Sequence, residues 1–194
     1  PRLRGHRSLI VGGGSGIGTA AIQLVRAAGG VVIVTAGSEA KCERCRQLGA
    51  QVAVDYNADD FVAGVREATQ GRGADVVLDS IGAPYLERNL ASLAVGGRLV
   101  VIGLMGGARA ELPMGVLLTR RLQLIGSTLR ARPAEEKAAI VSGFLARFGS
   151  GLEAGRIRPI VDRVLPLEQA GDAHRAMKAS EHFGKSVLRV AAGG

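Results

Sequence analysis

The stretch that decides the fold is Ser8-Leu9-Ile10-Val11-Gly12-Gly13-Gly14-Ser15-Gly16-Ile17-Gly18. A short apolar run leads into a glycine-rich turn, and apolar residues at helical spacing follow the turn as far as Gly29. A strand, a turn and a helix in this order expose backbone N–H groups at a helix N-terminus, where they bind the pyrophosphate of a dinucleotide. Ser15 replaces the middle glycine of the usual G-x-G-x-x-G pattern, but the context still predicts a dinucleotide-binding turn.

The same unit repeats along the chain, because short apolar runs alternate with longer amphipathic stretches. The expected strands cover residues 8–11, 31–35, 52–54, 74–79 and 98–102. The expected helices between and after them cover residues 17–29, 38–48, 59–69 and 85–93. Each pair of parallel strands needs a crossover of roughly a dozen residues or more. The pattern therefore predicts an α/β fold with a doubly wound, Rossmann-type parallel sheet.

The later part of the chain is less regular. Another strand is expected at Leu122–Leu129, and a helix from Pro133 to about Phe148. The last part of the chain does not look like further βα units. It is expected to contain an extended run at 157–165, a helix at 167–179 and a strand at 186–190. We therefore expect an NAD(P)-binding Rossmann domain over residues 1–154. The C-terminal segment, residues 155–194, is expected to form a different layer.

Composition excludes several classes of protein. The chain has 194 residues, of which 47% are hydrophobic, enough for one sizeable core. No window approaches the roughly 20 apolar residues of a membrane span, and the N-terminus lacks the apolar core of a secretion signal. The chain is expected to be soluble and cytoplasmic, without a membrane partner. Two cysteines cannot form a disulfide scaffold.

Cys42 and Cys45 invite a metal-binding interpretation. A structural zinc needs four ligands, and the other candidates are His6, His174 and His182, none of which has metal-ligand spacing. Residues three apart share one face of a helix. The two cysteines are therefore expected to face the core, and no metal is predicted.

The distribution of charge indicates whether the chain binds nucleic acid. The formal net charge is +8, but the 25 basic residues run along the whole length of the chain without a run of five or six. A solvated basic surface explains this spread better than a nucleic-acid interface does, so nucleic-acid binding is not expected.

The end of the second expected strand indicates which dinucleotide is bound. NAD-dependent enzymes normally place Asp or Glu there, where it accepts hydrogen bonds from the ribose hydroxyls. This chain has Thr35-Ala36-Gly37-Ser38, and its first carboxylate is that of Glu39. The hydroxyl of Ser38 and the ammonium of Lys41 suit the 2′-phosphate instead. The predicted cofactor is NADPH.

Two further turns lie at the carboxyl edge of the predicted sheet, where open α/β sheets bind their ligands. These turns are 79–82, which contains Ser80, and 102–107. Their small residues let the ribose and nicotinamide approach the backbone. No Ser/His/Asp or Cys/His set and no pair of carboxylates stands out. The cofactor is therefore expected to carry the chemistry, and no catalytic residue is named.

Several stretches together resemble one family. They are Val11–Leu24, Thr35–Ser38, Leu48–Ala50 with Tyr56, Gly126–Arg130, Gly155–Pro159 and Gly184–Lys185. The chain resembles the NADPH:quinone oxidoreductase branch, the zeta-crystallin-like branch, of the medium-chain dehydrogenase/reductase superfamily. The resemblance covers essentially the whole chain. It implies hydride transfer from NADPH to a quinone or an activated enone, without a catalytic zinc.

The resemblance also implies roles for individual residues. Ser15, Gly16, Ile17 and Gly18 would hold the pyrophosphate; Ser38, Lys41 and Tyr56 would surround the 2′-phosphate; Gly103 and Leu104 would line the nicotinamide side; and Lys185 is a weaker candidate for the same cleft. Members of the family usually dimerise through the strand that corresponds to Leu122–Leu129, which would otherwise be an exposed apolar edge. A homodimer is expected.

The chain departs from the family in length. Members carry an N-terminal GroES-like catalytic domain that shapes the quinone pocket, and residues 155–194 would normally complete that domain. We therefore expect the chain alone to bind NADPH and to turn over little. Whether the short length arises by design, by proteolysis or by gene truncation is left open.

Three alternatives compete with this interpretation. A short-chain dehydrogenase needs a tyrosine four residues before a lysine, but Asp60 follows Tyr56 at that distance and Asn89 follows Tyr85. The enoyl reductase module of a polyketide synthase shares the fold and the cofactor and stays open. So does a non-catalytic NADPH-binding or RNA-binding protein on the same scaffold.

Overall fold

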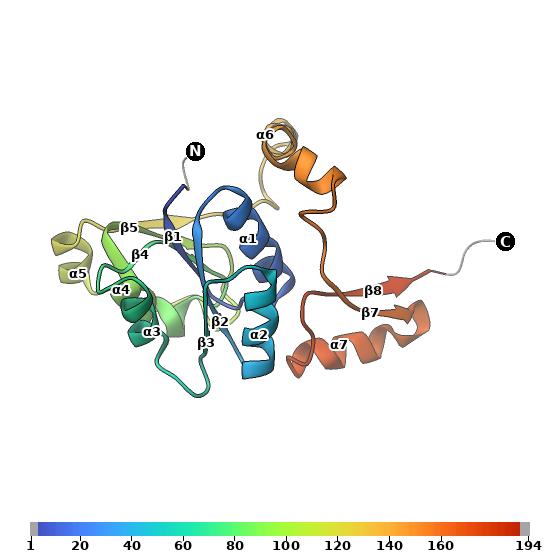
Figure 1. Cartoon of the computed structure of the whole chain (residues 1–194), viewed down its shortest axis with the longest axis horizontal. Helices are drawn as coiled ribbons and strands as arrows, with labels where there is room; N and C mark the ends of the chain where they lie inside the picture. The colour runs from blue at the N-terminus through green and yellow to red at the C-terminus, as the bar shows by residue number, and fades with distance from the viewer. Residues whose placement is uncertain (1–3, 191–194) are drawn as a thin grey trace.

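The computed structural model describes residues 4–190 and contains two sheets (Figure 1). The larger sheet has six strands in the order β3-β2-β1-β4-β5-β6, and every neighbouring pair is parallel. This is the strand order of a doubly wound dinucleotide-binding sheet, with its reversal between β1 and β4. The fold class expected from the sequence is confirmed.

The bounds of the elements follow the expected alternation. The strands of the large sheet are β1 (Arg7–Ile10), β2 (Val31–Ala36), β3 (Val52–Asp55), β4 (Ala74–Asp79), β5 (Leu93–Val101) and β6 (Gln123–Gly126). The helices are α1 (Gly16–Ala27), α2 (Glu39–Leu48), α3 (Phe61–Ala68), α4 (Leu86–Ser92), α5 (Met114–Thr119) and α6 (Ala134–Glu153).

The core lies on both faces of this sheet, because successive strand residues point to opposite faces. On one face Ile10, Val32 and Val34 pack with residues of α1 and α2. On the other face Leu9 and Ile33 pack with residues of α3, α4 and α5. Strands buried on both faces have continuous rather than alternating hydrophobic sequences, as the apolar runs indicated.

Local signals set the ends of the helices. The hydroxyl of Ser15 accepts a hydrogen bond from the amide of Gly18 at 2.9 Å, which caps α1. The hydroxyl of Ser38 accepts one from the amide of Lys41 at 3.3 Å, so the expected cap of α2 is confirmed. Gly49 ends α2 with a φ of +110°, a conformation that favours glycine.

Elements after β4 differ from the sequence expectation in their bounds. β5 begins at Leu93, five residues before the expected start, and α5 was not expected at all. The strand expected at Leu122–Leu129 is only Gln123–Gly126. It ends there because β5, its pairing partner, ends at Val101, whose carbonyl accepts the amide of Ser127. α6 continues past Phe148 to Glu153.

The C-terminal segment corrects another expectation. β7 (Val161–Pro166), α7 (Ala170–Lys178) and β8 (Lys185–Arg189) form a parallel strand–helix–strand unit, hereafter the C-terminal unit. It is thus a further βα unit, although its two strands form a sheet of their own. The sequence signal was weak because Pro159 and Pro166 lie beside or at the end of β7.

The C-terminal unit lies beside α1 and α2, at the end of the molecule opposite α5 (Figure 1). Ser15 and Gly184 form a parallel β-bridge, and the ring of Phe183 is buried in the core on the α1/α2 side of the sheet. The division of the chain at residues 154 and 155 stays a prediction, since these contacts join the two parts.

Candidate functional site

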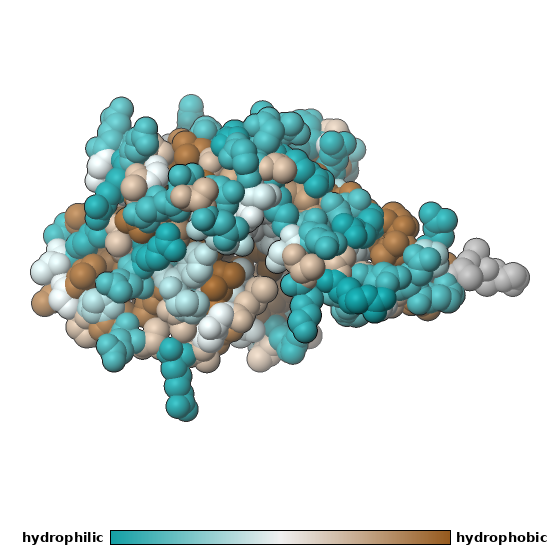
Figure 2. Space-filling model, turned by 90° about the horizontal axis from the view of Figure 1, so that it is seen from below, coloured by the Kyte–Doolittle hydropathy of each residue, from teal (hydrophilic) through white to brown (hydrophobic). Residues whose placement is uncertain are grey.

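A crevice of about 560 Å³ lies at the carboxyl edge of the large sheet, where the strand order reverses between β1 and β4. Seen from below, the surface is hollowed between the six-stranded part and the C-terminal unit (Figure 2). Of the residues named from the sequence, seven line the crevice: Ser15, Gly16, Ile17, Lys41, Tyr56, Ser80 and Lys185. Dinucleotides bind at this position in doubly wound sheets.

The glycine-rich turn is built from close backbone contacts. Gly12 has a φ of +79°, and its carbonyl accepts the amide of Ser15 at 3.0 Å. The amide of Gly13 donates to the carbonyl of Thr35 at 2.8 Å, which ties the turn to β2. A Cβ on Gly18 would lie 2.6 Å from the carbonyl oxygen of Gly13, closer than real Cβ contacts. Gly18 therefore lets α1 begin directly on the turn.

Ser15 explains the departure from the usual glycine pattern. Its backbone is extended, with φ −74° and ψ 164°, a conformation that any residue adopts. Its side chain caps α1, so a serine serves here where dinucleotide-binding turns often have glycine. The backbone N–H groups at the start of α1 lie at the end of the helix that borders the crevice. No acidic residue lies in the first turn of α1. An anion is favoured at such an end.

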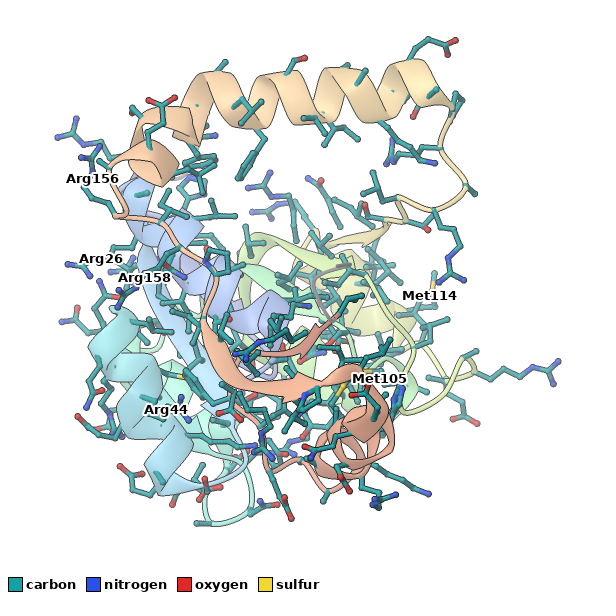
Figure 3. The ribbon with its side chains drawn as sticks, turned by 90° about the vertical axis from the view of Figure 1, so that its right-hand side faces the viewer. Arg26, Arg44, Met105, Met114, Arg156 and Arg158 are labelled. Carbon is teal, nitrogen blue, oxygen red and sulfur yellow. The ribbon has the colours of Figure 1, made fainter. Side chains whose placement is uncertain are left out.

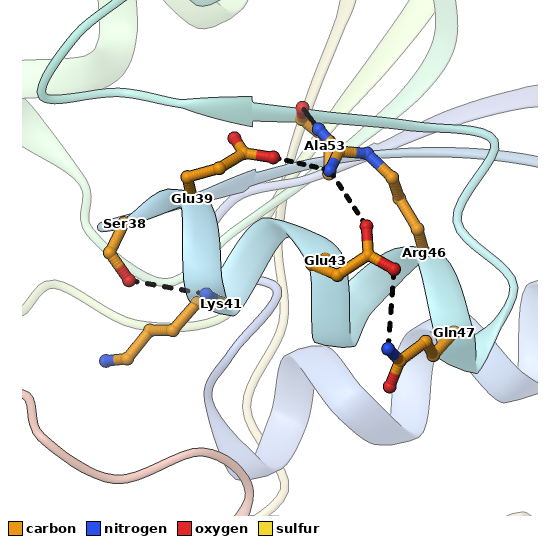
Figure 4. A network of polar contacts seen from close by, with 7 residues as sticks. All are labelled: Ser38, Glu39, Lys41, Glu43, Arg46, Gln47 and Ala53. Atoms are coloured by element: carbon orange, nitrogen blue, oxygen red, sulfur yellow. Dashed lines mark hydrogen bonds and ion pairs between the residues drawn. The ribbon is translucent and has the colours of Figure 1, made fainter.

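The end of β2 carries no carboxylate toward the crevice. The first one, Glu39, accepts a hydrogen bond from the guanidinium of Arg46 at 2.6 Å (Figure 4). Arg46 also contacts Glu43 at 3.2 Å, so both carboxylates are engaged along α2. The residues that line the crevice include Lys41 and Lys185 but no Asp or Glu. The described lining is therefore positively charged, which suits a phosphate.

Lys41 lies between the two parts of the molecule. Its ammonium donates a hydrogen bond to the carbonyl oxygen of Ser180, just after α7. The side chain of Tyr56 packs against Gly37, since a Cβ on Gly37 would lie 2.6 Å from the phenolic oxygen of Tyr56. Both side chains border the end of β2, the region expected to hold the ribose and its phosphate.

Four residues named from the sequence do not line the crevice: Gly18, Ser38, Gly103 and Leu104. Ser38 uses its hydroxyl to cap α2. A Cβ on Gly103 would lie 2.9 Å from the carbonyl of Ser80, so Gly103 allows the loops after β4 and β5 to approach each other. Leu104 packs near Gly82 and is 54% exposed. The structure gives these residues positions beside the crevice rather than in its wall.

Sequence reasoning pointed to the turns that contain Ile81 and Met105 but missed four other lining residues, namely Met177, Ser180, His182 and Ser186. All four lie in the C-terminal segment, whose packing no local pattern indicated. Nδ1 of His182 and Oγ of Ser186 are buried and have no hydrogen-bond partner among residues 4–190. Buried polar atoms normally have partners. These two atoms are exceptions to that rule.

Asp79 holds one wall of the crevice in place. Its buried carboxylate accepts the amides of Ile81 at 2.7 Å and Gly82 at 3.0 Å. Burial raises the pKa of Asp79, and the two amide hydrogen bonds oppose this rise. The carboxylate thus fixes the turn that follows β4 and carries Ser80.

The C-terminal unit closes the crevice from the other side. The amide of Gly184 donates to the carbonyl of Gly14 at 2.8 Å. A Cβ on Gly16 would lie 2.6 Å from Nζ of Lys185, so the lysine stem passes directly over the glycine-rich turn. The guanidinium of Arg44, on α2, stacks 4.0 Å from the ring centre of Phe183 and contacts Asp162 at 3.4 Å. These contacts position Lys185 at the crevice.

Residues 4–190 contain no group of three or more His, Cys, Asp or Glu side chains that could hold a metal. Cys42 and Cys45 are fully buried against the sheet, as expected from the sequence. Burial raises the pKa of Cys42 to about 11 and that of Cys45 to about 12, which opposes the thiolate form that zinc requires. The cysteines do not fit a zinc site.

Comparison with known proteins decides the family. Residues 16–143 match the family described as "Zinc-binding dehydrogenase". The chain belongs to this family. Quinone oxidoreductase-like protein 2 of Bos taurus is 31% identical over 82% of the chain and 45% of that protein. Quinone oxidoreductase of Rattus norvegicus is 29% identical over 96% of the chain and 56% of that protein.

The zinc-binding dehydrogenase fold is also found among solved structures. One described as an NAD-dependent alcohol dehydrogenase has a TM-score of 0.82 and 37% identity, covering 97% of this chain and 52% of the other. A 2-haloacrylate reductase has a TM-score of 0.78 and 31% identity, covering 98% and 59%. The chain thus spans about half the length of these relatives. The resemblance to the medium-chain dehydrogenase/reductase superfamily is confirmed.

A polyketide synthase also contains a stretch similar to this zinc-binding dehydrogenase chain. A phenolphthiocerol/phthiocerol polyketide synthase of Mycobacterium tuberculosis is 28% identical over 96% of the chain and 8% of that protein. The polyketide synthase alternative therefore stays open.

None of the helices among residues 4–190 is both long enough and apolar enough to cross a membrane. The cytoplasmic location expected from the sequence stays a prediction.

Proposed function

We propose that this chain is the NADPH-binding part of an oxidoreductase that transfers hydride from NADPH to a quinone or an activated enone without a catalytic zinc. The observation that carries the proposal is the crevice above the glycine-rich turn, which two lysines and no carboxylate line. NAD-dependent sites use a carboxylate at the end of β2, and this chain has none there.

The residues of the crevice fit this cofactor. The backbone at Ser15, Gly16, Ile17 and Gly18 would hold the pyrophosphate at the start of α1, where the helix dipole favours an anion. Lys41, with Ser38 and Tyr56 beside it, would hold the 2′-phosphate. The ammonium of Lys41 would exchange the neutral carbonyl of Ser180 for a charged phosphate, which forms the stronger hydrogen bond. Bound NADPH would supply the hydride.

Ser80 and the loop that contains Gly103 and Leu104 would border the nicotinamide side, and Lys185 would border the pyrophosphate side. Small residues at these turns leave the backbone close to the crevice, since Gly103 meets Ser80 without an intervening side chain. No residue of the chain is assigned as a proton donor. The chain's own part in the reaction is thus to bind and orient the cofactor.

Substitution of Lys41 tests the choice of cofactor. Lys41→Gln should weaken NADPH by about 1–3 kcal/mol, roughly 5- to 150-fold, and leave NADH binding unchanged, because only NADPH carries the 2′-phosphate. Titration of nucleotide fluorescence measures both constants. Lys137→Gln is a matched control, because its ammonium also donates to a backbone carbonyl, that of Arg130 at 3.0 Å, away from the crevice. Equal losses for NADPH and NADH would remove Lys41 from the 2′-phosphate site.

The substrate class rests on the relatives. The protein named quinone oxidoreductase supports a quinone as the acceptor. The 2-haloacrylate reductase is named for an α,β-unsaturated carboxylate, whose activated C=C bond is also the reacting group of an enone. The chain should bind NADPH, but a steady-state assay with NADPH and a simple quinone should show little turnover, because the chain spans about half the length of these relatives. Robust turnover would contradict the need for a further substrate-binding part.

A polyketide enoyl reductase is the second candidate, and the similarity to the mycobacterial polyketide synthase supports it. The two candidates differ in the acceptor. A quinone accepts hydride as a free small molecule, whereas an enoyl reductase acts on an enoyl thioester. Preference for a crotonyl thioester over a quinone, in a longer protein that contains this chain, would favour the second candidate.

We further propose that two copies associate through β6. This strand pairs only with β5 among the described residues, and all four of its residues are exposed. Leu124 is 44% and Ile125 is 38% exposed. An exposed apolar edge strand favours pairing with a second strand, and a two-fold axis would pair β6 with its own copy.

A further inference from the structure

A second cavity, of about 490 Å³, lies at the opposite edge of the molecule from the crevice. α1 and α2 run from the carboxyl edge of the sheet to its amino edge, and this cavity is lined by their last residues, Arg26, Ala27 and Leu48. The last turns of α6 and the loop after it complete the wall. We refer to it as the amino-edge cavity.

Three arginines from three separate segments line the amino-edge cavity: Arg26 from α1, Arg147 from α6 and Arg156 from the following loop. Figure 3 shows Arg26 and Arg156 near the end of α6, apart from Met105, which lines the crevice. All three side chains belong to exposed residues, so a solute can reach them.

Neighbouring groups hold each arginine in place. The stem of Arg26 lies over Gly49, where a Cβ would be 2.5 Å from its Cδ. The guanidinium of Arg147 stacks 5.2 Å from the ring centre of Phe148. The guanidinium of Arg156 donates to the carbonyl of Ser150 at 3.2 Å. Side chains that are already positioned lose less conformational entropy when a ligand binds.

The charge of these arginines is uncompensated. None of the three forms an ion pair with an Asp or Glu of residues 4–190, and no carboxylate lines the cavity. Other arginines of the chain do have acidic partners, namely Arg44, Arg46, Arg72, Arg88, Arg132, Arg163 and Arg175. Three like charges around one cavity repel each other, and a bound anion removes that repulsion.

Part of the cavity wall is apolar. Leu48, Phe148 and Ile157 line it together with Ala27. The hollow exists partly because Gly151, in the last turn of α6, has no side chain, and a Cβ there would lie 3.0 Å from Ile157. Apolar side chains and guanidinium groups in the wall of one cavity suit a solute that has an apolar body and an anionic head. The volume is within the usual range for small-molecule sites.

We infer that the amino-edge cavity binds a small organic phosphate monoester with an apolar or aromatic body. A phosphate monoester is close to doubly charged at neutral pH, and its oxygens match the planar fork of guanidinium donors. The site is separate from the crevice and does not depend on the function proposed for the crevice.

The loop that closes the amino-edge cavity also reaches the crevice. The side-chain amide of Gln23 donates to the carbonyl of Arg158 at 2.9 Å, and its oxygen accepts the amide of Arg158 at 3.0 Å. Two residues on, the carbonyl of Ile160 accepts the amide of Lys185 at 2.8 Å. The segment from Arg156 to Ile160 thus borders the amino-edge cavity at one end and contacts Lys185 at the other.

Calorimetric titration of the whole chain with three probes tests the inference. Phenyl phosphate supplies both the body and the head, inorganic phosphate supplies the head alone, and phenol supplies the body alone. Phenyl phosphate should bind with one equivalent and at least about tenfold tighter than inorganic phosphate, and phenol should give no binding heat. Equal affinities for the two phosphates, or no binding of phenyl phosphate, would overturn the inference.

Substitutions show which of the two sites binds phenyl phosphate. Arg147→Gln and Arg156→Gln should each weaken phenyl phosphate at least about tenfold, while Arg66→Gln, at an exposed helical arginine outside the cavity, should leave its affinity within about twofold. Lys41→Gln separates the two sites, because it alters only the crevice. Binding that Lys41→Gln weakens and Arg147→Gln does not would assign the probe to the crevice and reject the amino-edge site. Circular dichroism checks that each variant is folded.

Discussion

At the scale of single residues, the glycines of the chain differ in the room around them. A Cβ on Gly18 would meet the carbonyl of Gly13 at 2.6 Å, whereas a Cβ on Gly143, in the middle of α6, would meet no atom within 4 Å. A backbone oxygen cannot rotate away as a side chain can. The glycine at position 18 is therefore required by packing, and the one at position 143 is not.

Gly18→Ala should lower the free energy of unfolding by about 1–3 kcal/mol, the usual cost of overpacking. Gly143→Ala, the matched control, should raise it by about 0.5–1 kcal/mol because alanine favours helix. Urea unfolding measures both. Equal stability of Gly18→Ala and the unsubstituted chain would contradict the tight turn described here.

The two cysteines give a prediction that depends on pH. Their pKa values are raised to about 11 and about 12, so at pH 8 fewer than about one thiol in a thousand is ionised in the folded chain. Because the thiolate is the reactive form, a thiol reagent such as 5,5′-dithiobis(2-nitrobenzoate) should label the native protein only as fast as it opens. Both thiols should react at once in denaturant. Rapid labelling of the native chain at pH 8 would show that they are accessible.

Sequence reasoning found those crevice residues that follow directly from local patterns. Ser15 and Gly16 belong to the turn itself, and Lys41 lies in the first turn of α2. His182 and Ser180 could not be found, because they reach the crevice only through the packing of Phe183 and Gly184 on the turn. The role of Gln23 was missed for the same reason, since its partner Arg158 is 135 residues away.

At the scale of elements, the contact between the C-terminal unit and α2 depends on one ring. Phe183 is only 2% exposed, and Arg44 stacks on its other side. Phe183→Ala should cost about 3–5 kcal/mol of the free energy that holds the unit in place.

Amide hydrogen exchange can locate that loss. In Phe183→Ala, exchange should accelerate in β7, α7 and β8, while β4 and β5 keep their protection, because their buried side chains belong to the core on the other face of the sheet. Phe148→Ala is a useful comparison, since that ring lies by the amino-edge cavity and is half-buried. Uniform acceleration over all strands would mean that the unit and the sheet unfold together.

Elements were predictable from the sequence where the hydrophobic period was unambiguous. β4 was expected at 74–79 and has those bounds, because the apolar residues Val76, Val77 and Leu78 lead directly to the buried Asp79. α5 was missed because it is a six-residue helix with no side-chain cap and no buried residue. The C-terminal unit was misjudged because its strands bury one face only, and exposed hydrophobic positions such as Val161 and Val164 mask the period.

At the scale of the whole molecule, the proposed dimer makes a prediction about size. Ile125→Lys places a charge on the exposed edge strand β6 and should convert the dimer to a monomer, because an unpaired charge opposes strand pairing. Light scattering after size-exclusion chromatography measures the mass. Val164→Lys, at an exposed apolar residue of β7, serves as the control and should leave the mass unchanged. A monomeric unsubstituted chain would reject the proposed association.

The crevice unites residues from almost the full length of the chain, since Gly12 and Ser186 both line it. During synthesis, a ribosome releases the first of these long before the second. A nascent chain whose strand β8 is still inside the ribosomal exit tunnel has the glycine-rich turn but only one wall of the crevice. Under the proposed function, NADPH added to stalled ribosomes should therefore bind nascent chains in which β8 has left the tunnel and should not bind shorter ones.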